Sequence, residues 1–481
     1  MNRRMIFNAV GMMLRVEAAL LLLPAITSAI YRESEAFAFL SAAILGYAIG
    51  ILPKLLYKPK THVIYAKEGF IIVAFSWIML SLIGSLPFII SGEIPRLADA
   101  FFETVSGFTT TGASILTDVE AHSHGVLFWR SFTHWIGGMG IIVFVTAIIP
   151  NVSERPIHIL RAEMPGPTMG KLVPRIKDTA VILYLIYMVM TVIETVLLCI
   201  GGMPFFESLL HSFGTAGTGG FGLKGNSIAG YSPYIQWVIG IFMVLFGVNF
   251  NLYYLIIIKK LKTAVKSREL WFFFAVIGIS TLLITFNIRY LFGNFSETLR
   301  TAFFQVASII STTGYATADF NTWPQFSRYL ILLLMFFGGC AGSTAGGMKM
   351  SRIMMLFKLI RNETQRLIHP RAVTSLRFEG KTVDGATSRN LSNYFLIYFV
   401  CLAVIVLLLC GEPFSFLTNF SAAVSCFNNV GPGLDAVGPA SSYAAYSDFA
   451  KYILSFAMLL GRLEIFPIII AFSPSAWLRN K

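Results

Sequence analysis

Residues 308–320 read SIISTTGYATADF, so a polar turn, Thr-Thr-Gly-Tyr, directly follows the largely apolar segment 301-TAFFQVAS-308. At membrane depth, backbone that is not helical is tolerated only where protein buries it or where it lines a water-filled cavity. If the surrounding chain crosses a bilayer, this stretch predicts a short helix that enters the membrane and ends in a turn inside the protein.

The composition is that of a membrane protein. The chain has 481 residues, 56% of them hydrophobic and 13% charged, and its mean hydropathy is +0.71. Apolar runs such as 71–90 and 395–410 approach or exceed the ~20 residues that cross a hydrocarbon core. We therefore expect an all-α polytopic membrane protein. The apolar stretch 16–30 carries Glu17 and no small-residue cleavage site follows it, so we interpret it as a retained helix.

The net charge of +13 is unevenly distributed. Acidic residues gather between the basic segments, which hold most of the 37 Lys and Arg and are the N-terminus, 54–67, 155–177, 259–268, 349–389 and the last three residues. This alternation is the positive-inside pattern, which predicts that both termini are cytoplasmic and that the number of full spans is even. Nucleic-acid binding is disfavoured because no basic run is interleaved with exposed aromatic residues.

One unit is repeated four times along the chain: a long apolar span, a short apolar segment, a polar glycine turn and another apolar span. The short segments, each too brief to cross a bilayer, are 97–108, 205–214, 297–308 and 414–426. The turns that follow are 109-TTTGA-113, 216-AGTGG-220, 311-STTGY-315 and 428-NNVGP-432, and we align their glycines as Gly112, Gly219, Gly314 and Gly431.

Four such half-helices can meet on one axis and point rows of carbonyl oxygens at it. Their C-terminal dipole ends would favour a cation, and a ring of carbonyls that replaces an ion's hydration shell is the principle of a potassium filter, of which Thr-x-Gly-Tyr is a local form. The alternative is four unrelated polar hairpins between helices. Recurrence at four equivalent places favours the pore.

The order TTTGA, GTGGF, STTGY and NNVGPG, followed by 338-GGCAGSTAGGMK-349 in the third unit, resembles the Trk/Ktr/HKT superfamily of potassium transporters, most closely its TrkH/TrkG type. The resemblance covers nearly the whole chain. It implies four pseudo-repeated helix–pore-loop–helix units around one ion pore, preceded by two N-terminal spans (16–30 and 36–53), and therefore ten full spans. In that superfamily, glycine at all four filter positions goes with potassium preference.

This plan divides the chain into five parts: an N-terminal helix pair (1–60) and pore repeats 1 (61–150), 2 (151–265), 3 (266–385) and 4 (386–481). We expect potassium to bind, as substrate, only at filter residues, which are Thr110, Thr111, Gly112, Gly217, Thr218, Gly219, Gly220, Thr312, Thr313, Gly314, Tyr315, Asn429, Val430 and Gly431.

Segment 338–349 interrupts an apolar run with closely spaced glycines, which break or loosen a helix. One interpretation is a small-residue packing face formed by Gly342 and Gly346. The resemblance implies the other, an intramembrane gating loop below the third filter turn. Its expected gating residues are Gly338, Gly339, Gly342, Gly346, Gly347 and Lys349.

Three further charged residues lie inside apolar spans, where a charge is costly and rarely accidental. Arg462 either pairs locally with Glu464 or faces the pore below the filter, bonded to carbonyls of the glycine-rich loop, which the resemblance favours. For Glu17 and Glu194 we expect buried structural pairing without a named partner.

Other residues of the sequence give weaker indications of function. The pair His122 and His124 lacks a third metal ligand nearby, and the five scattered cysteines have no metal-like spacing. Residues 217–222, GTGGFG, match a dinucleotide fingerprint but lack the flanking strand and helix that such a site needs.

The leading hypothesis is potassium uptake across a bacterial inner membrane through a channel-like pore. The alternative is a proton- or sodium-coupled secondary cation symporter. An enzyme is disfavoured because the spans carry too few ionisable groups to build an active site. The resemblance also implies a homodimer seated on a cytosolic ring of nucleotide-binding regulatory subunits of the RCK/KTN, TrkA-like type, so we expect no cofactor in this chain and nucleotide only on that partner. The basic inner loops 155–177 and 349–389 are the available docking surface, although their charge also has a simpler explanation in topology alone.

Overall fold

The computed structural model describes residues 3–56, 66–140, 176–371, 376–383 and 385–477, and nearly all of its regular structure is helical. The expected all-α class is confirmed. The helices are α1 (Arg3–Leu20), α2 (Leu22–Ile30), α3 (Ala36–Leu56), α4 (Ala66–Ile90), α5 (Leu97–Phe108), α6 (His124–Gly138), α9 (Ile176–Ile200), α10 (Phe205–Gly217), α11 (Pro233–Phe246), α12 (Phe250–Ile257), α13 (Leu261–Val265), α14 (Arg268–Ile288), α15 (Phe295–Ile310), α16 (Gln325–Leu334), α17 (Met350–Ile368), α18 (Gly385–Leu409), α19 (Phe416–Phe427), α20 (Asp448–Arg462), α21 (Phe466–Phe472) and α22 (Pro474–Trp477).

Short elements complete the described part. The strands β1 (Arg377–Phe378) and β2 (Lys381–Thr382) form a two-residue antiparallel hairpin. Single turns of 3₁₀ helix occur at η1 (Arg289–Leu291), η2 (Phe320–Thr322) and η3 (Asp435–Val437).

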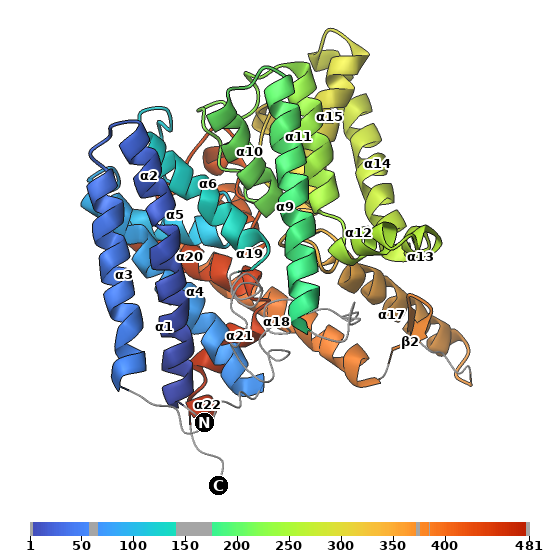
Figure 1. The fold of residues 1–481 in the computed structure, drawn as a ribbon. Coiled ribbons are helices and arrows are strands. Elements are labelled where there is room, and N and C mark those ends of the chain that lie inside the picture. The colour runs from blue at the N-terminus through green and yellow to red at the C-terminus, as the bar shows by residue number, and fades with distance from the viewer. Residues whose placement is uncertain (1–2, 57–65, 141–175, 372–375, 384, 478–481) are drawn as a thin grey trace.

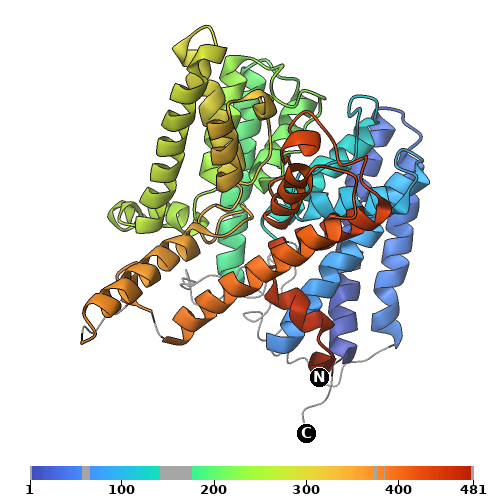
Figure 2. The same cartoon turned by 180° about the vertical axis from the view of Figure 1, so that it is seen from behind.

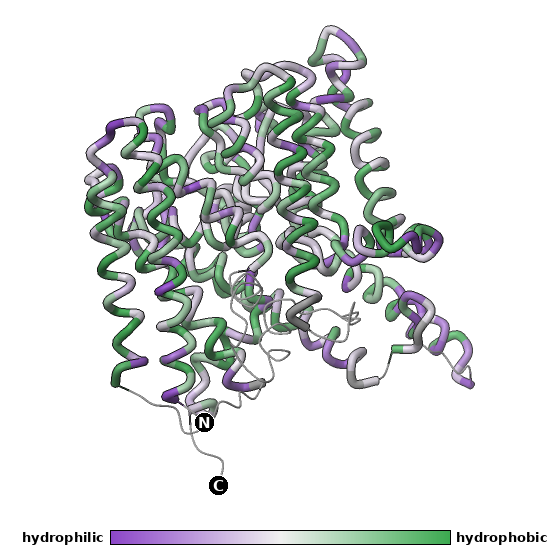
Figure 3. Tube along the Cα trace, in the orientation of Figure 1, coloured by the Kyte–Doolittle hydropathy of each residue, from purple (hydrophilic) through white to green (hydrophobic). Residues whose placement is uncertain are grey.

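Most of the long helices stand roughly side by side, although α17 and α18 run obliquely to them (Figure 1). The side-by-side helices are largely apolar, with hydrophilic residues mostly at their ends and in the connections (Figure 3). Six helices of the described part are long and apolar enough to cross a membrane: Arg3–Ile30, Ala36–Leu56, Lys67–Ile90, Thr179–Ile200, Arg268–Leu291 and Thr387–Leu409. Two further pairs of helices are bent at a short break: α11 with α12, by 92°, and α20 with α21, by 118°. If each bent pair counts as one span, the described part has eight spans.

Ten spans were expected, and the difference has a local cause. In repeat 1, α6 ends at Gly138, close to residues that lie outside the described part. In repeat 3, α16 ends at Leu334 and the helix resumes as α17 only after the glycine-rich segment.

The first span is longer than predicted. It begins at Arg3 and not at residue 16, because Ile6, Met13 and Leu14 form a buried face on α1, which packs against α3 and α4. The two described ends of the chain also meet, since Nη2 of Arg3 donates to the carbonyl oxygen of Trp477 at 3.3 Å. Two ends that lie together are compatible with an even number of membrane crossings.

Four short helices, α5, α10, α15 and α19, occupy the places predicted for half-helices, with ends within three residues of the predicted ones. Each packs against the two helices that flank it in sequence, for example α5 against α4 and α6. Contacts also join neighbouring repeats: α6 packs on α10, α11 on α15, α17 on α18, and α20 on α5. Figure 2 shows the same arrangement from behind. The four turns that end these short helices are thereby brought to the centre.

Candidate functional site

The four short helices end in the same backbone conformation. The first residue past each helix or its C-cap has a left-handed φ between 55° and 57°, and the residue two positions further is a glycine with φ between 74° and 101°. We call the resulting segments the ring strands, 110–112, 218–220, 312–314 and 429–431, and their last residues the ring glycines, Gly112, Gly220, Gly314 and Gly431.

This conformation corrects the alignment of the second repeat. The sequence aligned Gly219 with the other three glycines, but the position equivalent to Gly112 is Gly220, because the left-handed residue that begins the strand is Thr218. Two adjacent glycines in GTGGF, Gly219 and Gly220, both fit the pattern, and the alignment chose the first. Gly219 instead packs outward, where a Cβ would meet the ring of His134.

The ring strands touch one another in a closed cycle. A Cβ added to any ring glycine would collide with a carbonyl oxygen of the next strand. That oxygen always belongs to the residue just before the ring glycine of the next strand. The contacts are Gly112 to Gly219, Gly220 to Thr313, Gly314 to Val430, and Gly431 to Thr111. Only glycine fits such an approach and such a φ. Four carbonyl groups at one level can coordinate a cation in place of its water.

Side chains of the ring strands are turned into the protein, where they are buried. The Thr111 hydroxyl lies 2.8 Å from that of Thr109 and accepts a hydrogen bond from Nδ2 of Asn429 at 2.9 Å. The Thr313 hydroxyl is paired with Ser311 at 2.7 Å. The first and fourth strands are thus joined by a side-chain bond as well as by the cyclic contact.

Two tyrosines support the ring from outside. The hydroxyl of Tyr315, which follows the third strand, donates to the carbonyl oxygen of His211 on α10 at 3.3 Å and so reaches into the second repeat. The hydroxyl of Tyr443 donates to the carbonyl oxygen of Gly431 at 2.8 Å. Both side chains are buried, so they fix the positions of the strands they touch.

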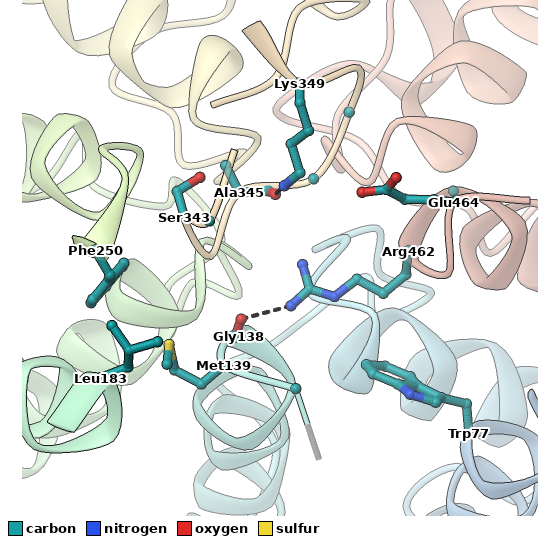
Figure 4. A pocket seen from close by; sticks show the side chains of 15 residues that line it. Trp77, Gly138, Met139, Leu183, Phe250, Ser343, Ala345, Lys349, Arg462 and Glu464 are labelled. Atoms are coloured by element: carbon teal, nitrogen blue, oxygen red, sulfur yellow. Dashed lines mark hydrogen bonds between the residues drawn. The ribbon is translucent and has the colours of Figure 1, made fainter. Parts of the chain in front are cut away.

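Cavities lie on both sides of the ring. One of about 280 Å³ is lined by all four ring glycines together with loop residues such as Lys224, Ser227 and Tyr443. A smaller one, of about 50 Å³, is lined by Gly138, Arg462, Glu464 and much of the glycine-rich segment 338–349 (Figure 4). The two are adjacent to the same ring, because the amide of Gly346 donates to the Thr312 hydroxyl at 2.7 Å.

The glycine-rich segment is not a helical packing face. It is a loop with left-handed glycines at Gly342 and Gly347, and it is held by backbone bonds on several sides. The amide of Gly338 donates to the carbonyl of Met348 at 2.8 Å, and the amide of Cys340 donates to that of Gly247 at 2.9 Å. These bonds support the loop interpretation over the small-residue face.

Arg462 ends α20 and points into the small cavity (Figure 4). Its guanidinium group donates to the carbonyl oxygens of Thr344 at 2.8 Å, Gly137 at 2.5 Å and Gly138 at 2.8 Å. Glu464, the local partner considered from the sequence, forms an ion pair with Arg352. Carbonyl bonding, including one bond to the glycine-rich segment, is therefore the arrangement in the structure.

Lys349 is the last residue of the segment and its side chain turns back on it. The ammonium group donates to the carbonyl oxygen of Ala345, and Figure 4 shows Lys349 in the same cavity as Arg462 and Glu464. Gly339 contributes its carbonyl oxygen to the amide of Met350 at 3.1 Å. All six expected gating residues of the segment thus lie in one loop below the ring.

Sequence reasoning missed other charged residues around the ring. Glu103 and Arg130 form a buried ion pair beside the first strand, and Glu269 accepts the amides of Ala341 and Ser351 at 2.7 and 3.1 Å. The rule that marked Arg462, a charge inside an apolar span, would have found Arg130. It would not have marked Glu103, which lies on a short helix, or Glu269, which is the second residue of α14.

The buried pairing expected for Glu17 and Glu194 does not take the form of an ion pair. Both side chains are buried, but neither has an ion-pair partner among the residues that the structure describes. Glu17 lies instead in an apolar pocket beside Phe108 and Ile136, at the end of α5. Apart from Glu17 itself, the described residues that line this pocket are apolar.

Comparison with known proteins gives consistent matches. The model of a family described as "TrkH: Cation transport protein" matches residues 35–481. The chain is 37% identical to the Trk system potassium uptake protein TrkH of Salmonella typhimurium, over 99% of this chain and 100% of that protein. It is 34% identical to TrkG of Escherichia coli K12, over 98% of each. The crystal structure of the potassium transporter TrkH from Vibrio parahaemolyticus superposes with a TM-score of 0.90, at 32% identity, over 99% of this chain and 100% of that one.

Proposed function

The chain belongs to the TrkH family of cation transport proteins, and from this membership we propose that it takes up potassium through a pore whose selectivity filter is the ring of four glycine strands. It is a transporter and not an enzyme. Relatives that match this chain over their full length are named as potassium uptake proteins, and this supports potassium as the substrate.

The observation that carries the filter proposal is the closed cycle of contacts between ring strands. Each ring glycine lies against a backbone oxygen of the next strand, and the fourth strand returns to the first. A cycle of this kind packs each strand directly against the backbone of the next. Such preorganised carbonyl groups discriminate between cations by their number and dipole strength and by the size of the site.

We propose further that the glycine-rich segment and Arg462 form the gate. The segment is bonded to the third ring strand through Gly346, and Arg462 places a guanidinium group in the cavity just beyond it. A fixed cation and a plug of backbone on the ion path would both oppose flux. Opening requires that the segment leave the cavity, and flexible glycine backbone makes that movement possible.

The decisive experiment measures ion flux into vesicles that contain only the purified protein. With a potassium gradient and no gradient of protons or sodium, a pore admits rubidium or potassium far faster than sodium. Flux that stops unless a proton or sodium gradient is imposed would favour the coupled symporter instead. Equal permeability to potassium and sodium would contradict the filter.

For the assembly, we propose a homodimer in the bacterial inner membrane with cytoplasmic termini, regulated by a cytosolic ring of nucleotide-binding subunits. The Trk system names of the relatives support a membrane component that works with other subunits. Basic residues outside the long spans, such as Arg371 and Arg377, would form part of the docking surface; both are exposed. Most of the other expected surface, 155–177, lies outside the described residues.

A further inference from the structure

A buried ion pair stands behind the first ring strand. Nε of Arg130, on α6, donates to Oε1 of Glu103, on α5, at 2.7 Å, and the two side chains are 2% and 0% exposed. Burying both charges is costly unless the remaining lone pairs and protons are also bonded. The further contacts of this pair therefore indicate what it is there to hold.

The carboxylate of Glu103 holds the chain just beyond the first ring glycine. It accepts the amide of Ile115 at 2.9 Å and the hydroxyl of Ser114 at 3.0 Å. Nη2 of Arg130 donates to the same Ser114 hydroxyl at 3.2 Å. Residues two and three positions after Gly112 are thus fixed by both members of the pair.

Arg130 also reaches the second repeat. Its guanidinium carbon lies 4.1 Å from the centre of the Phe221 ring, and Phe221 directly follows the ring glycine Gly220. A guanidinium group stacks favourably on an aromatic face when both are desolvated. One buried pair therefore contacts the chain immediately after two adjacent ring strands.

In repeats 3 and 4, the side chains at or next to the position of Glu103 are uncharged and bond within their own repeat. In repeat 3, Gln305 stands at the place of Glu103, nine residues before the ring glycine, and its Nε2 donates to the carbonyl of Ala318 at 3.1 Å. In repeat 4, the Ser421 hydroxyl accepts the amide of Leu434 at 2.9 Å. Each holds only its own strand. Extension to a neighbouring strand through a charged group distinguishes the Glu103–Arg130 pair from these two tethers.

We propose that Glu103 and Arg130 are positioning residues that set the spacing of the first and second ring strands and thereby the preference for potassium over sodium. The inference rests on the proposed filter function. Carbonyl groups discriminate between ions through the geometry and number of their dipoles, so a change in the spacing of two strands alters discrimination. Neither residue belongs to a ring strand, although Arg130 also lines the larger cavity beside the ring.

Three variants test this proposal in vesicles. Glu103→Gln removes the charge and keeps the shape of the side chain, and Arg130→Lys keeps the charge and loses the planar guanidinium group. The third variant is Phe221→Leu. The last separates Arg130 from the second strand and leaves no buried charge unpaired. The potassium-to-sodium flux ratio should fall by about tenfold in each, as expected when a preorganised site loses a fraction of an ångström in precision.

A second ion pair on the same short helix is the matched control. Asp99 and Lys451 lie 2.5 Å apart, with side chains 17% and 3% exposed, and they join the first turn of α5 to α20. Asp99→Asn should lower thermal stability and leave the flux ratio within twofold of wild type. A merely structural role for Glu103 and Arg130 predicts the same pattern for both pairs.

Each outcome decides between these interpretations. An unchanged ratio in folded Arg130→Lys and Phe221→Leu would overturn the proposal, and so would an equal loss of selectivity in Asp99→Asn. If Glu103→Gln does not fold, Phe221→Leu still decides the matter. Failure of the filter function itself would be recognised separately, because wild-type protein would then show no potassium preference to lose.

Discussion

Arg462 donates a hydrogen bond from Nη1 to the carbonyl oxygen of Thr344 at 2.8 Å, which fastens the end of α20 to the glycine-rich segment. One side chain therefore both places a positive charge in the cavity below the ring and holds the backbone that fills it. The two contributions can be separated by substitution.

Replacing Arg462 by alanine should raise potassium flux several-fold, because it removes the fixed cation and the bonds to the segment. Arg462→Lys is the control that keeps the charge. If the charge is the barrier, the lysine variant stays close to wild type; if the bonds matter more, its flux rises as well. Flux in reconstituted vesicles measures both, and lower flux from folded Arg462→Ala would contradict the gate.

Glu269 offers an independent way to loosen the same segment. Its Oε1 accepts the amides of Ala341 and Ser351, at the two sides of the loop. Glu269→Ala leaves both amides without this acceptor, at a cost of about 1–3 kcal/mol for each unsatisfied buried group, and basal flux should rise. Deleting two residues of 338–349 should act in the same direction.

The matched control for Glu269 is Glu379, whose Oε1 accepts the amides of Arg268 and Glu269 at 2.9 and 3.1 Å at the start of the same helix. Glu379→Ala should disturb that helix end without raising flux. If both alanine variants conduct alike, the effect belongs to α14 and not to the segment.

Serine at a ring glycine should weaken potassium preference over sodium. A side chain at Gly112, Gly220 or Gly314 meets a carbonyl of the next strand and also has to adopt a left-handed φ, which costs about 1–2 kcal/mol. Gly202 has the same kind of φ, 88°, but open space around it. Gly202→Ser should therefore be strained and fully selective. Flux ratios for potassium, rubidium and sodium distinguish the two effects.

Neutralising Arg371, Arg377 and Lys381 together should weaken binding of the cytosolic regulatory ring and make what binding remains less dependent on salt, because exposed charge pairs are screened at high ionic strength. Co-purification at low and high salt measures this. Lys54→Gln, at an exposed base near the end of α3, controls for net charge. Wild-type binding by the triple variant at both salt concentrations would place the docking surface elsewhere.

Acid should release a contact in the loops that precede α6. Burial favours a raised pKa for Glu93, but hydrogen bonds from the His122 side chain and the Ser123 amide outweigh it and hold this pKa below its ordinary value. A carboxyl group with a depressed folded pKa stabilises the protein above its unfolded pKa, and that contribution is lost as pH falls through the folded value. The difference in melting temperature between wild type and Glu93→Gln should therefore shrink from pH 6 to pH 3.5. A constant difference would mean that the pair contributes no pH-dependent stability.

Much of this arrangement could be predicted from the sequence. The half-helices were recognisable because an apolar segment too short to span ends in a polar glycine turn, and α5 has the predicted bounds, 97–108. The position of Arg462 followed from the cost of a charge inside a span, although the choice between its two partners came from resemblance.

What the sequence could not decide depended on conformation or on distant contacts. In GTGGF only the left-handed φ of Thr218 identifies Gly220 as the ring glycine. The extension of the first span to Arg3 depends on packing against α3, which local hydropathy does not report. The links from Glu269 to Ala341 and from Arg352 to Glu464 join residues 72 and 112 positions apart, a separation that no spacing rule covers.

Because one polypeptide closes the cycle from Gly431 back to Thr111, a point substitution alters a single quarter of the ring. In a pore assembled from four identical chains the same change would be made four times over. The four quarters here are genetically independent, so each can drift, and be probed, without its counterparts. Serine could be introduced at one, two, three or four ring glycines in turn, and the resulting graded series would report whether an ion is selected by the weakest quarter or by the average of all four.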